Sequence, residues 1–169
     1  MIVRPAVPED ALSVARVHVR AWQAAYRGFM PDSYLDGLSV EDRARRYNFS
    51  SADVTQPRTL LAEEAGAISG FATTSPARDE DARGQGELCA LYVEPERWGR
   101  GIGRALVVAA REALCRQGFT RAVLWVLAGN ARAERFYRAD GWTADGLRRG
   151  QSVWNVTVDS VRYRRATLR

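Results

Sequence analysis

The residues with the clearest chemical meaning form a glycine-rich turn in the second half of the chain. An apolar segment stops at Pro95, and Gly99, Gly101 and Gly103 follow at alternate positions before a helical pattern begins. Such glycines leave backbone N–H groups uncovered, and the first turn of a helix adds unpaired N–H groups and the positive end of the helix dipole. This combination suits phosphate binding. Arginines surround the turn, at Arg97, Arg100 and Arg104. The sequence therefore predicts a site for a phosphorylated small molecule.

Two better-known phosphate loops do not fit this turn. A dinucleotide fingerprint needs G-x-G-x-x-G early in a βαβ unit and an acidic residue about 20 positions later. Here the spacing is G-x-G-x-G, past the middle of the chain. A P-loop needs a lysine after its last glycine, and this sequence contains no lysine. The alternative that stays open is a structural turn that binds nothing.

A second candidate group follows an apolar segment over residues 122–128. It reads Asn130-x-x-Ala133-x-x-Phe136-Tyr137-x-x-x-Gly141-Trp142. Asn130 is expected to cap the helix that follows. The phenol of Tyr137 is able to donate a proton. The alternative for this tyrosine is a packed aromatic side chain beside Phe136.

Length and composition fit one globular domain. The 169 residues, 46% of them hydrophobic, are enough for a core of its own. No apolar run approaches the roughly 18 residues of a membrane span. The first residues lack the apolar region of a signal peptide. We therefore expect a single cytoplasmic domain over residues 1–169, with no membrane partner.

Charge and metal-binding side chains exclude further classes. The formal net charge of +5 suits a nucleic acid, an acidic metabolite or a phosphorylated cofactor. Because the arginines are scattered and no nucleic-acid motif matches, no nucleic-acid partner is expected. Cys89 and Cys115 are expected to be reduced core residues. His18, the only histidine, is expected at the boundary of the core. Because none of these three side chains has a neighbour at the spacing of metal ligands, no metal site is expected.

The N-terminal third is predicted to be mainly helical. After a short strand over 2–6, a helix opens at Pro8 with acidic residues near its positive end. Its apolar positions recur at spacings of three and four and predict one buried stripe. The stripe comprises Leu12, Ala15, Val19, Trp22 and Tyr26. A second helical piece begins at Pro31, and Ser39 opens a third that reaches about Phe49.

The rest of the chain is predicted to form a sheet with two further helices, which gives a mixed α/β domain. The predicted strands cover residues 59–64, 68–75, 87–93, 122–128, 142–149 and 152–164. The predicted helices cover residues 101–117 and 130–139. The first two strands form a hairpin, and the fourth is apolar enough for burial on both faces. A polar, glycine-containing loop over 78–86 is expected to be mobile.

The two motifs and the interval between them closely resemble the GNAT superfamily of acetyl-CoA-dependent N-acetyltransferases. The resemblance extends to the start of the chain, to the segment Trp22–Gly28, and to the closing segment Val161–Arg164. It implies an α/β (α+β) fold in which helices flank a mixed, mostly antiparallel sheet of about seven strands. Two parallel central strands splay apart and admit the cofactor. Those strands are here the segments 87–93 and 122–128.

The resemblance also implies where acetyl-CoA binds. Backbone groups of the first splayed strand would pair with the pantetheine arm, and the glycine turn would hold the diphosphate. The residues so assigned are Leu91, Tyr92 and Val93 on the strand, Trp98, Gly99, Arg100, Gly101, Ile102, Gly103 and Arg104 in the turn, and Asn130, Ala133, Phe136 and Tyr137 beyond the second strand. Trp98 departs from the family pattern, which has Gln or Arg at this position. We expect Arg97 or Arg100 to compensate.

Two residues are candidates for proton transfer. By resemblance, Tyr137 protonates the departing thiolate, and a phenol with a pKa near 10 suits a thiolate of comparable basicity. Glu87 is the best-placed carboxylate to deprotonate the amine. Strand alternation would place Glu87 on one face with Cys89 and Leu91. An exposed carboxylate at the end of a strand is the alternative reading of Glu87.

Other residues of the two motifs have two readings each. Asn130 caps its helix or contacts the cofactor arm. Trp22 and Tyr26 pack in the core or, by resemblance, form a wall of the acceptor pocket. The acidic loop Asp79-Glu80-Asp81 attracts a cationic amine or is a solvated turn.

The function implied is transfer of acetyl from acetyl-CoA to a primary amine by direct attack in a ternary complex. A covalent acetyl-Cys89 route lacks a neighbouring histidine that would activate the thiol. The alternatives are a non-catalytic CoA or acyl-CoA sensor with the same fold and a nucleic-acid-binding protein. The acceptor, a small-molecule or peptide amine, stays open. Homodimerisation is common in this superfamily, but nothing in the sequence fixes an interface.

Overall fold

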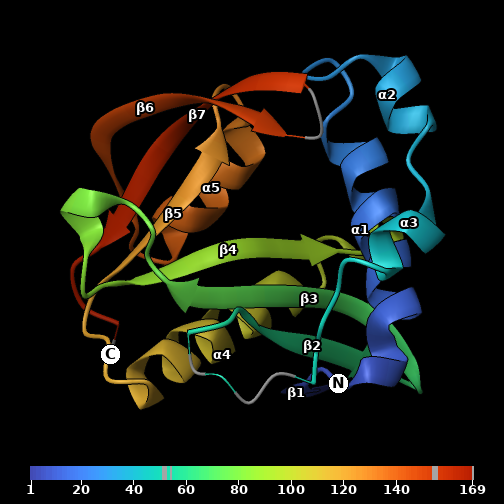
Figure 1. Ribbon diagram of the computed structural model, residues 1–169, viewed down its shortest axis with the longest axis horizontal. Helices are drawn as coiled ribbons and strands as arrows, with labels where there is room; N and C mark the ends of the chain where they lie inside the picture. Colours follow the sequence, from blue (N-terminus) through green and yellow to red (C-terminus); the bar gives the residue numbers. More distant parts are fainter. Residues whose placement is uncertain (51–52, 54, 154–155, 169) are drawn as a thin grey trace.

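The computed structural model contains one seven-stranded sheet in the order β1-β2-β3-β4-β5-β7-β6 (Figure 1). It describes residues 1–50, 53, 55–153 and 156–168. The strands are β1 (Ile2–Pro5), β2 (Arg58–Glu64), β3 (Ala67–Pro76), β4 (Gly86–Val93), β5 (Ala122–Leu127), β6 (Thr143–Val153) and β7 (Val156–Arg165). Among the strands of the described residues, only β4 and β5 pair in parallel. The mixed, mostly antiparallel sheet is therefore confirmed. Trp154 and Asn155, within the strand predicted over 152–164, lie outside the described residues.

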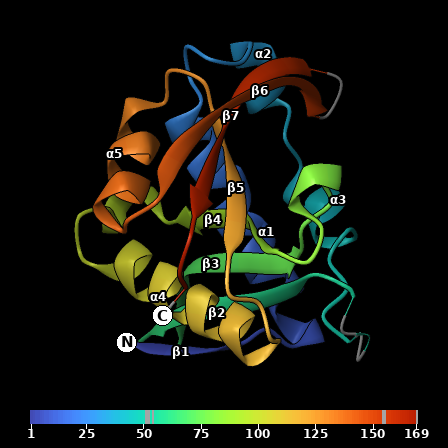
Figure 2. The ribbon, with the colours of Figure 1, turned by 90° about the vertical axis from the view of Figure 1, so that its left-hand side faces the viewer.

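Helices cover both faces of the sheet (Figure 2). They are α1 (Ala11–Ala25), α2 (Asp32–Asp36), α3 (Val40–Ala44), α4 (Ile102–Arg116) and α5 (Ala131–Ala139). Alternate residues of β2 and β3 point to opposite faces. On one face Leu61 and Phe71 pack with residues of α1, and on the other Ala62 and Ala72 pack in the core that contains Leu106 of α4. The first half of the sheet is therefore buried between α1 and α4.

The sheet opens between its two parallel strands. β4 and β5 pair only at Gly86 with Ala122 and at Glu87 with Val123. Beyond these residues the strands diverge (Figure 1), while β5 stays paired with β7 over its whole length. The splay predicted between these strands is confirmed. It leaves the C-terminal half of β4 without a neighbour on this edge.

A bulge in β4 changes which residues share a face. Thr73 pairs with Ala90 and Thr74 with Leu88, so Cys89 is the extra residue. Leu88 and Leu91 therefore both belong to the core under α4. Ala90 and Tyr92 lie in the core on the α1 side. The prediction that Glu87 and Leu91 share a face is wrong, because the bulge interrupts the alternation of the strand.

Two predictions in the N-terminal third are also corrected. The helix expected to reach Phe49 ends at Ala44, although its Ser39 cap is present, with the Asp42 amide donating to Ser39 Oγ at 3.1 Å. Leu12, placed on the buried stripe of α1, is 41% exposed. The rest of that stripe is buried, with the side chain of Tyr26 half-buried at the helix end.

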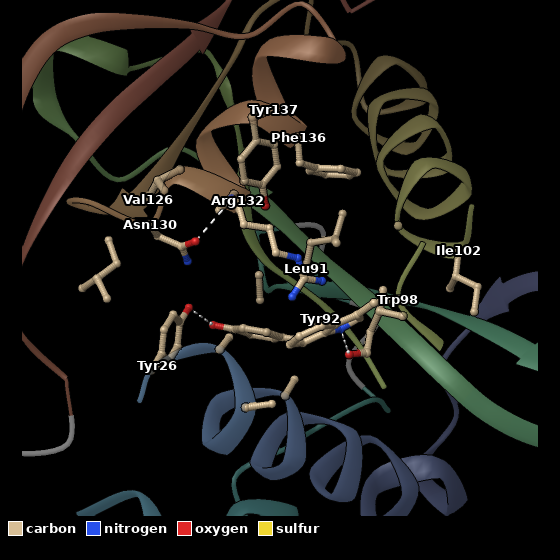
Figure 3. Close-up of a pocket in the computed structure, with 18 of the residues that line it drawn as sticks. Tyr26, Leu91, Tyr92, Trp98, Ile102, Val126, Asn130, Arg132, Phe136 and Tyr137 are labelled. Atoms are coloured by element: carbon tan, nitrogen blue, oxygen red, sulfur yellow. Dashed lines mark hydrogen bonds between the residues drawn. The ribbon is translucent and has the colours of Figure 1, made fainter. Parts of the chain in front are cut away.

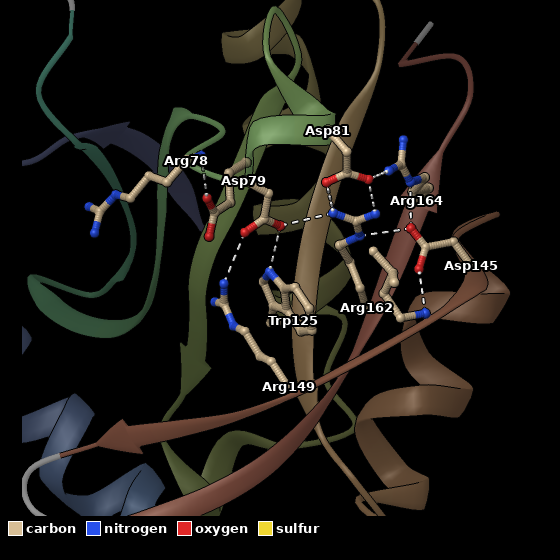
Figure 4. A network of polar contacts seen from close by, with 10 residues as sticks. Arg78, Asp79, Asp81, Trp125, Asp145, Arg149, Arg162 and Arg164 are labelled. Atoms are coloured by element: carbon tan, nitrogen blue, oxygen red, sulfur yellow. Dashed lines mark hydrogen bonds and ion pairs between the residues drawn. The ribbon is translucent and has the colours of Figure 1, made fainter.

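Ion pairs tie down the polar loop that the sequence predicts to be mobile (Figure 4). Arg162 of β7 is 1% exposed and bonds to Asp79 at 3.0 Å, to Asp81 at 2.5 Å and to Asp145 at 2.7 Å. Asp79 also accepts from Arg149, and Asp81 and Asp145 also pair with Arg164. The two loop carboxylates Asp79 and Asp81 are thus neutralised within the protein. The hypothesis that they attract a cationic amine is not supported.

Within the described residues, no helix combines the length and the apolar character needed to cross a bilayer.

Candidate active site

A cavity of about 730 Å³ opens in the splay between β4 and β5 (Figure 3). It extends from the glycine turn at the start of α4 to the first turns of α5. The predicted residues that line it are Leu91, Tyr92, Val93, Trp98, Gly99, Gly101, Ile102, Gly103, Arg104, Asn130, Ala133, Phe136 and Tyr137. Arg100 is exposed and does not line the cavity. The structure thus brings all the predicted cofactor residues except Arg100 to one place.

The glycine turn has the geometry that a phosphate group needs. Gly99 and Gly101 adopt φ of +78° and +82°, and Gly101 is the N-cap of α4. The first amide of this helix to find a partner is that of Ala105, which donates to the Gly101 carbonyl at 3.0 Å. Within the described part of the chain the amides of Ile102, Gly103 and Arg104 have no backbone partner, as expected at a helix N-terminus, and they are available to a ligand. Close packing explains the glycine at position 103, because a Cβ there would lie 3.3 Å from the ring of Phe136.

Trp98 holds the end of β4. Its indole Nε1 donates to the carbonyl oxygen of Val93 at 2.8 Å, and its ring packs against the core under α4. Arg97 lines the cavity, but its guanidinium bonds to Glu64 at 2.6 Å. The expected compensation by Arg97 or Arg100 stays a prediction, and neither guanidinium is poised for it.

The helix after β5 brings two polar side chains to the cavity. Asn130 Oδ1 accepts from the Ala133 amide at 3.1 Å, so the predicted cap is confirmed. Because Asn130 also lines the cavity, it is free to contact a ligand through its Nδ2. Tyr137 lies edge-on to Phe136 and Trp142, with ring centroids 5.1 and 6.3 Å away. Burial, and then the neighbouring Tyr92, raise the pKa of Tyr137, so its phenol stays protonated at neutral pH.

A second, smaller cavity of about 130 Å³ reaches the splay from the side of α1 and the β6–β7 hairpin. It is lined by Trp22, Tyr26, Met30, Glu87, Cys89, Tyr92, Trp125, Leu127, Arg149, Val158 and Ser160. Five of these side chains also line the larger cavity, so the two cavities meet at Tyr26, Cys89, Tyr92, Trp125 and Leu127. The hydroxyls of Tyr26 and Tyr92 lie 3.3 Å apart at this junction (Figure 3).

Glu87 is the acidic side chain of the smaller cavity. Its carboxylate accepts from the Arg78 amide at 3.4 Å, and within the described residues no arginine forms an ion pair with it. Desolvation raises its pKa. A carboxylate held in this way is a stronger base than one in water. The structure therefore separates Tyr137 and Glu87 into two cavities that share one wall.

Cys89 is the bulged residue and is exposed in the cavities, so the prediction of a core cysteine is wrong. Its Sγ lies 3.1 Å from Ser75 Oγ. Desolvation, together with the Glu87 charge, raises the pKa of the thiol to about 11. The thiol is therefore neutral at physiological pH and is a poor nucleophile.

His18 is buried deeper than the predicted boundary position. Its Nδ1 lies 2.5 Å from the Tyr47 hydroxyl, and its ring stacks on Tyr92 with centroids 4.8 Å apart. Burial lowers its pKa well below the ordinary value. It lines neither cavity. Among the described residues, no group of three or more His, Cys, Asp or Glu side chains could hold a metal ion.

The sequence patterns did not mark Trp125, Arg149 or Arg132 as lining a cavity. Trp125 lines both cavities and donates from Nε1 to Asp79 at 3.1 Å. Arg149 stacks over Trp125, with its guanidinium carbon 3.9 Å from the ring centroid. Arg132 lines the larger cavity. No local pattern marks the first two, because the contacts that place them join segments 46 and 70 residues apart in sequence.

The family model described as the acetyltransferase (GNAT) family matches residues 19–142. The chain belongs to this family. The matched segment runs from α1 to Trp142 and so contains the splay, the glycine turn and α5. This GNAT protein is therefore an acyltransferase that uses acetyl-CoA as the acetyl donor of N-acetyl transfer, as predicted.

Relatives of this GNAT protein carry acetyltransferase names. The chain is 35% identical over 131 residues to the uncharacterized N-acetyltransferase YuaI of Bacillus subtilis, covering 76% of this chain and 72% of that protein. It is 39% identical over 135 residues to a mycothiol acetyltransferase of Thermobispora bispora, covering 76% of this chain and 45% of that protein. The chain thus matches less than half the length of the second relative.

Solved structures share the fold of this GNAT protein. The PaiA N-acetyltransferase of Thermoplasma acidophilum, solved in complex with coenzyme A, superposes with a TM-score of 0.71 at 20% identity. The match covers 94% of this chain and 96% of that one. This likeness shows the fold alone.

Proposed function

We propose that residues 1–169 form one catalytic domain that acetylates a primary amine by direct attack in a ternary complex. The observation that carries the proposal is the meeting of two cavities at the splay, with Tyr137 in the larger one and Glu87 in the smaller one. The donor would enter from the side of the glycine turn and the amine from the side of α1. Strands from both ends of the chain belong to the one sheet, which supports a single domain.

The glycine turn and β4 would hold the donor. Free amides at the start of α4 suit its diphosphate, and the unpaired edge of β4 offers backbone groups to an extended pantetheine arm. The larger cavity then leads to Tyr137. Held there, the thioester carbonyl lies at the junction of the two cavities, within reach of an amine in the smaller one.

Glu87 would act as the base for the amine. An ammonium group that enters the smaller cavity gives its proton to the Glu87 carboxylate, and the neutral amine attacks the thioester carbon. The C–N bond forms as the C–S bond breaks, the attacking nitrogen then loses its second proton to solvent, and the Glu87 carboxyl group releases its proton to solvent as well. The raised pKa of Glu87 brings it closer to the pKa of the ammonium group, and the smaller difference in pKa favours this proton transfer.

Tyr137 would protonate the departing thiolate and regain its proton from water. Its raised pKa makes it a weaker acid than tyrosine in water. Desolvation likewise raises the pKa of the Cys89 thiol, which lines the same cavity, with a further contribution from the Glu87 charge. A CoA thiolate desolvated in this cavity would also be more basic than in water, which favours proton transfer from Tyr137.

The test combines thiol release across a panel of amines with two variants. Tyr137→Phe is expected to lower kcat by roughly 100-fold or more while leaving the Kd for CoA unchanged, because general acid catalysis contributes about that much. Glu87→Gln is expected to lower kcat/KM at neutral pH and to recover as the pH rises past the pKa of the amine. Glu112→Gln, the same change on the outer face of α4, serves as the control.

Three results would count against these roles. If Tyr137→Phe weakened CoA binding by the same factor as it lowered kcat, the hydroxyl of Tyr137 would serve binding or structure and not proton transfer. If the loss in Glu87→Gln were independent of pH, the carboxylate would not be the base. If the wild-type protein bound CoA and released no thiol with any amine, the sensor alternative would replace catalysis.

The acceptor stays at the level of a primary amine on a small molecule or a peptide. Several relatives are named mycothiol acetyltransferases, so amines that also carry a thiol group belong in the panel. Trp22 and Tyr26 line the smaller cavity and would contact the acceptor. A cytoplasmic location, the absence of a nucleic-acid partner and a homodimer remain predictions from sequence.

A further inference from the structure

Arg132 reaches across the larger cavity and stacks on Trp98 (Figure 3). The guanidinium carbon lies 3.3 Å from the centroid of the indole ring. Trp98 belongs to the turn before α4, and Arg132 to the first turn of α5. Both side chains line the cavity. The stacked pair therefore links the two walls of the groove that the donor must enter.

The indole that carries Arg132 is fixed in place. Trp98 Nε1 donates to the Val93 carbonyl at 2.8 Å, and the ring packs against the core under α4. Indole is the best aromatic partner of a guanidinium, which stacks flat on its face. Stacking holds a long side chain in one orientation and so reduces the entropy that a later contact would cost.

The charge of Arg132 is not compensated within the protein. Among the described residues no carboxylate forms an ion pair with it, whereas Arg97 on the same cavity bonds to Glu64 at 2.6 Å. Arg132 is an exposed side chain that lines the cavity, and partial desolvation there lowers its pKa. An unpaired guanidinium in a groove built for a phosphorylated donor is stabilised when an anion arrives.

We propose that Arg132 binds a phosphate group of coenzyme A and that Trp98 positions its guanidinium for this contact. Trp98 is then a positioning residue that serves the donor through Arg132, at the place where the family usually has Gln or Arg. The inference rests on the proposed donor site in the splay. The guanidinium offers two parallel N–H groups, which match two oxygens of one phosphate group.

The first experiment measures binding to the purified protein by calorimetry. Arg132→Gln is expected to weaken CoA roughly 10- to 100-fold, because hydrogen bonds to charged groups contribute on that scale. Arg135→Gln is the matched control, since it makes the same change of charge at an exposed position on the same helix, outside both cavities. It is expected to leave the Kd unchanged.

A phosphate-free donor separates recognition from structural damage. With S-acetylpantetheine, kcat/KM is expected to be the same for the wild type and Arg132→Gln. Trp98→Leu is expected to weaken CoA less than Arg132→Gln does, and the double variant no more than Arg132→Gln alone. Trp98→Phe, which keeps a ring, is expected to recover part of the affinity.

3′-Dephospho-CoA identifies which phosphate is bound. If Arg132→Gln loses affinity for CoA but not for 3′-dephospho-CoA, Arg132 binds the 3′-phosphate. If the variant loses affinity for both ligands, Arg132 binds the diphosphate. An unchanged Kd for CoA, or an equal loss with S-acetylpantetheine, overturns the proposal. If the wild type itself bound no CoA, the donor site would fail instead, which is a different result.

Discussion

Gly101→Ala tests whether the left-handed turn is needed for donor binding. Gly101 has φ of +82°, and a Cβ there meets nothing within 4 Å. The cost of the substitution is therefore backbone strain alone, roughly 1–2 kcal/mol for a left-handed residue other than glycine. For a chain of this length that amounts to a fall in Tm of about 2–8 °C.

The strain also bears on binding. If the variant keeps the left-handed turn, it is merely less stable. If the turn relaxes, the following peptides rotate and their amides leave the cavity. The fraction of the protein that still has the left-handed turn then falls by a factor set by the strain energy. A strain of about 1–2 kcal/mol therefore raises the Kd for CoA roughly 5- to 30-fold. Calorimetry with CoA measures this change.

Gly118→Ala is the matched control for this experiment. Gly118 follows the other end of α4 with φ of +91°, and a Cβ there also meets nothing within 4 Å. It carries the same strain at about 22 Å from the turn, because a 15-residue helix rises about 1.5 Å per residue. The reasoning is refuted if both variants weaken CoA equally, or if Gly101→Ala leaves the Kd unchanged.

Three further predictions concern the thiol and the ion-pair network. Cys89→Ala is expected to keep full turnover, since the pKa of the thiol near 11 leaves it neutral; loss of turnover with CoA binding intact would revive a covalent route. Arg162→Met removes the buried guanidinium that Asp79, Asp81 and Asp145 share, and it is expected to lower the free energy of unfolding in urea by about 3 kcal/mol, the lower end for a broken buried pair because Arg149 and Arg164 still pair with these carboxylates. Arg148→Met, which breaks the exposed pair with Asp159, is the control and is expected to change the free energy of unfolding only slightly. An effect of Arg162→Met as small as that of the control would contradict this reasoning. Because Arg162 lowers the pKa of Asp81 to about 2, the stability from this contact is complete above about pH 4 and lost as the pH falls toward 2. Asp81→Asn is therefore expected to show a smaller loss of stability across that window, and an unchanged acid dependence would count against it.

Most of the fold could be predicted because local signals agree with the tertiary structure. The strand and helix around the glycine turn, the hairpin of β2 and β3, and the cap at Asn130 each depend on residues a few positions apart. The predicted cofactor residues come from the same local motifs, and all of them except Arg100 line the cavity. Arg100 lies in the same turn but is exposed and does not line the cavity.

Contacts between distant segments could not be predicted in this way. The cap at Ser39 marks where its helix begins but not where it ends: the helix stops at Ala44, and Tyr47 and Phe49 pack on the core of α1 and β3 from outside a helix. The acidic loop is polar in sequence, and this local pattern is compatible with a solvated turn or with a contact to a cationic substrate. Its partners, Arg149 and Arg162, lie 70 and more residues later.

The bulge at Cys89 has the largest consequence of these distant contacts. Without it, Glu87 and Leu91 would face the same side of β4, and the acidic group would lie on the side of the cofactor cavity. One extra residue keeps Glu87 in the smaller cavity while Leu91 turns toward α4. In the proposed mechanism the strand itself would then separate the base from the donor phosphates, and the base would meet the thioester only at the splay. Removing the bulge by deletion of Cys89 would move one of these groups to the wrong cavity, whereas Cys89→Ala keeps the residue count and both faces. Loss of turnover in the deletion alone would show that strand register, not the thiol, is what this position supplies.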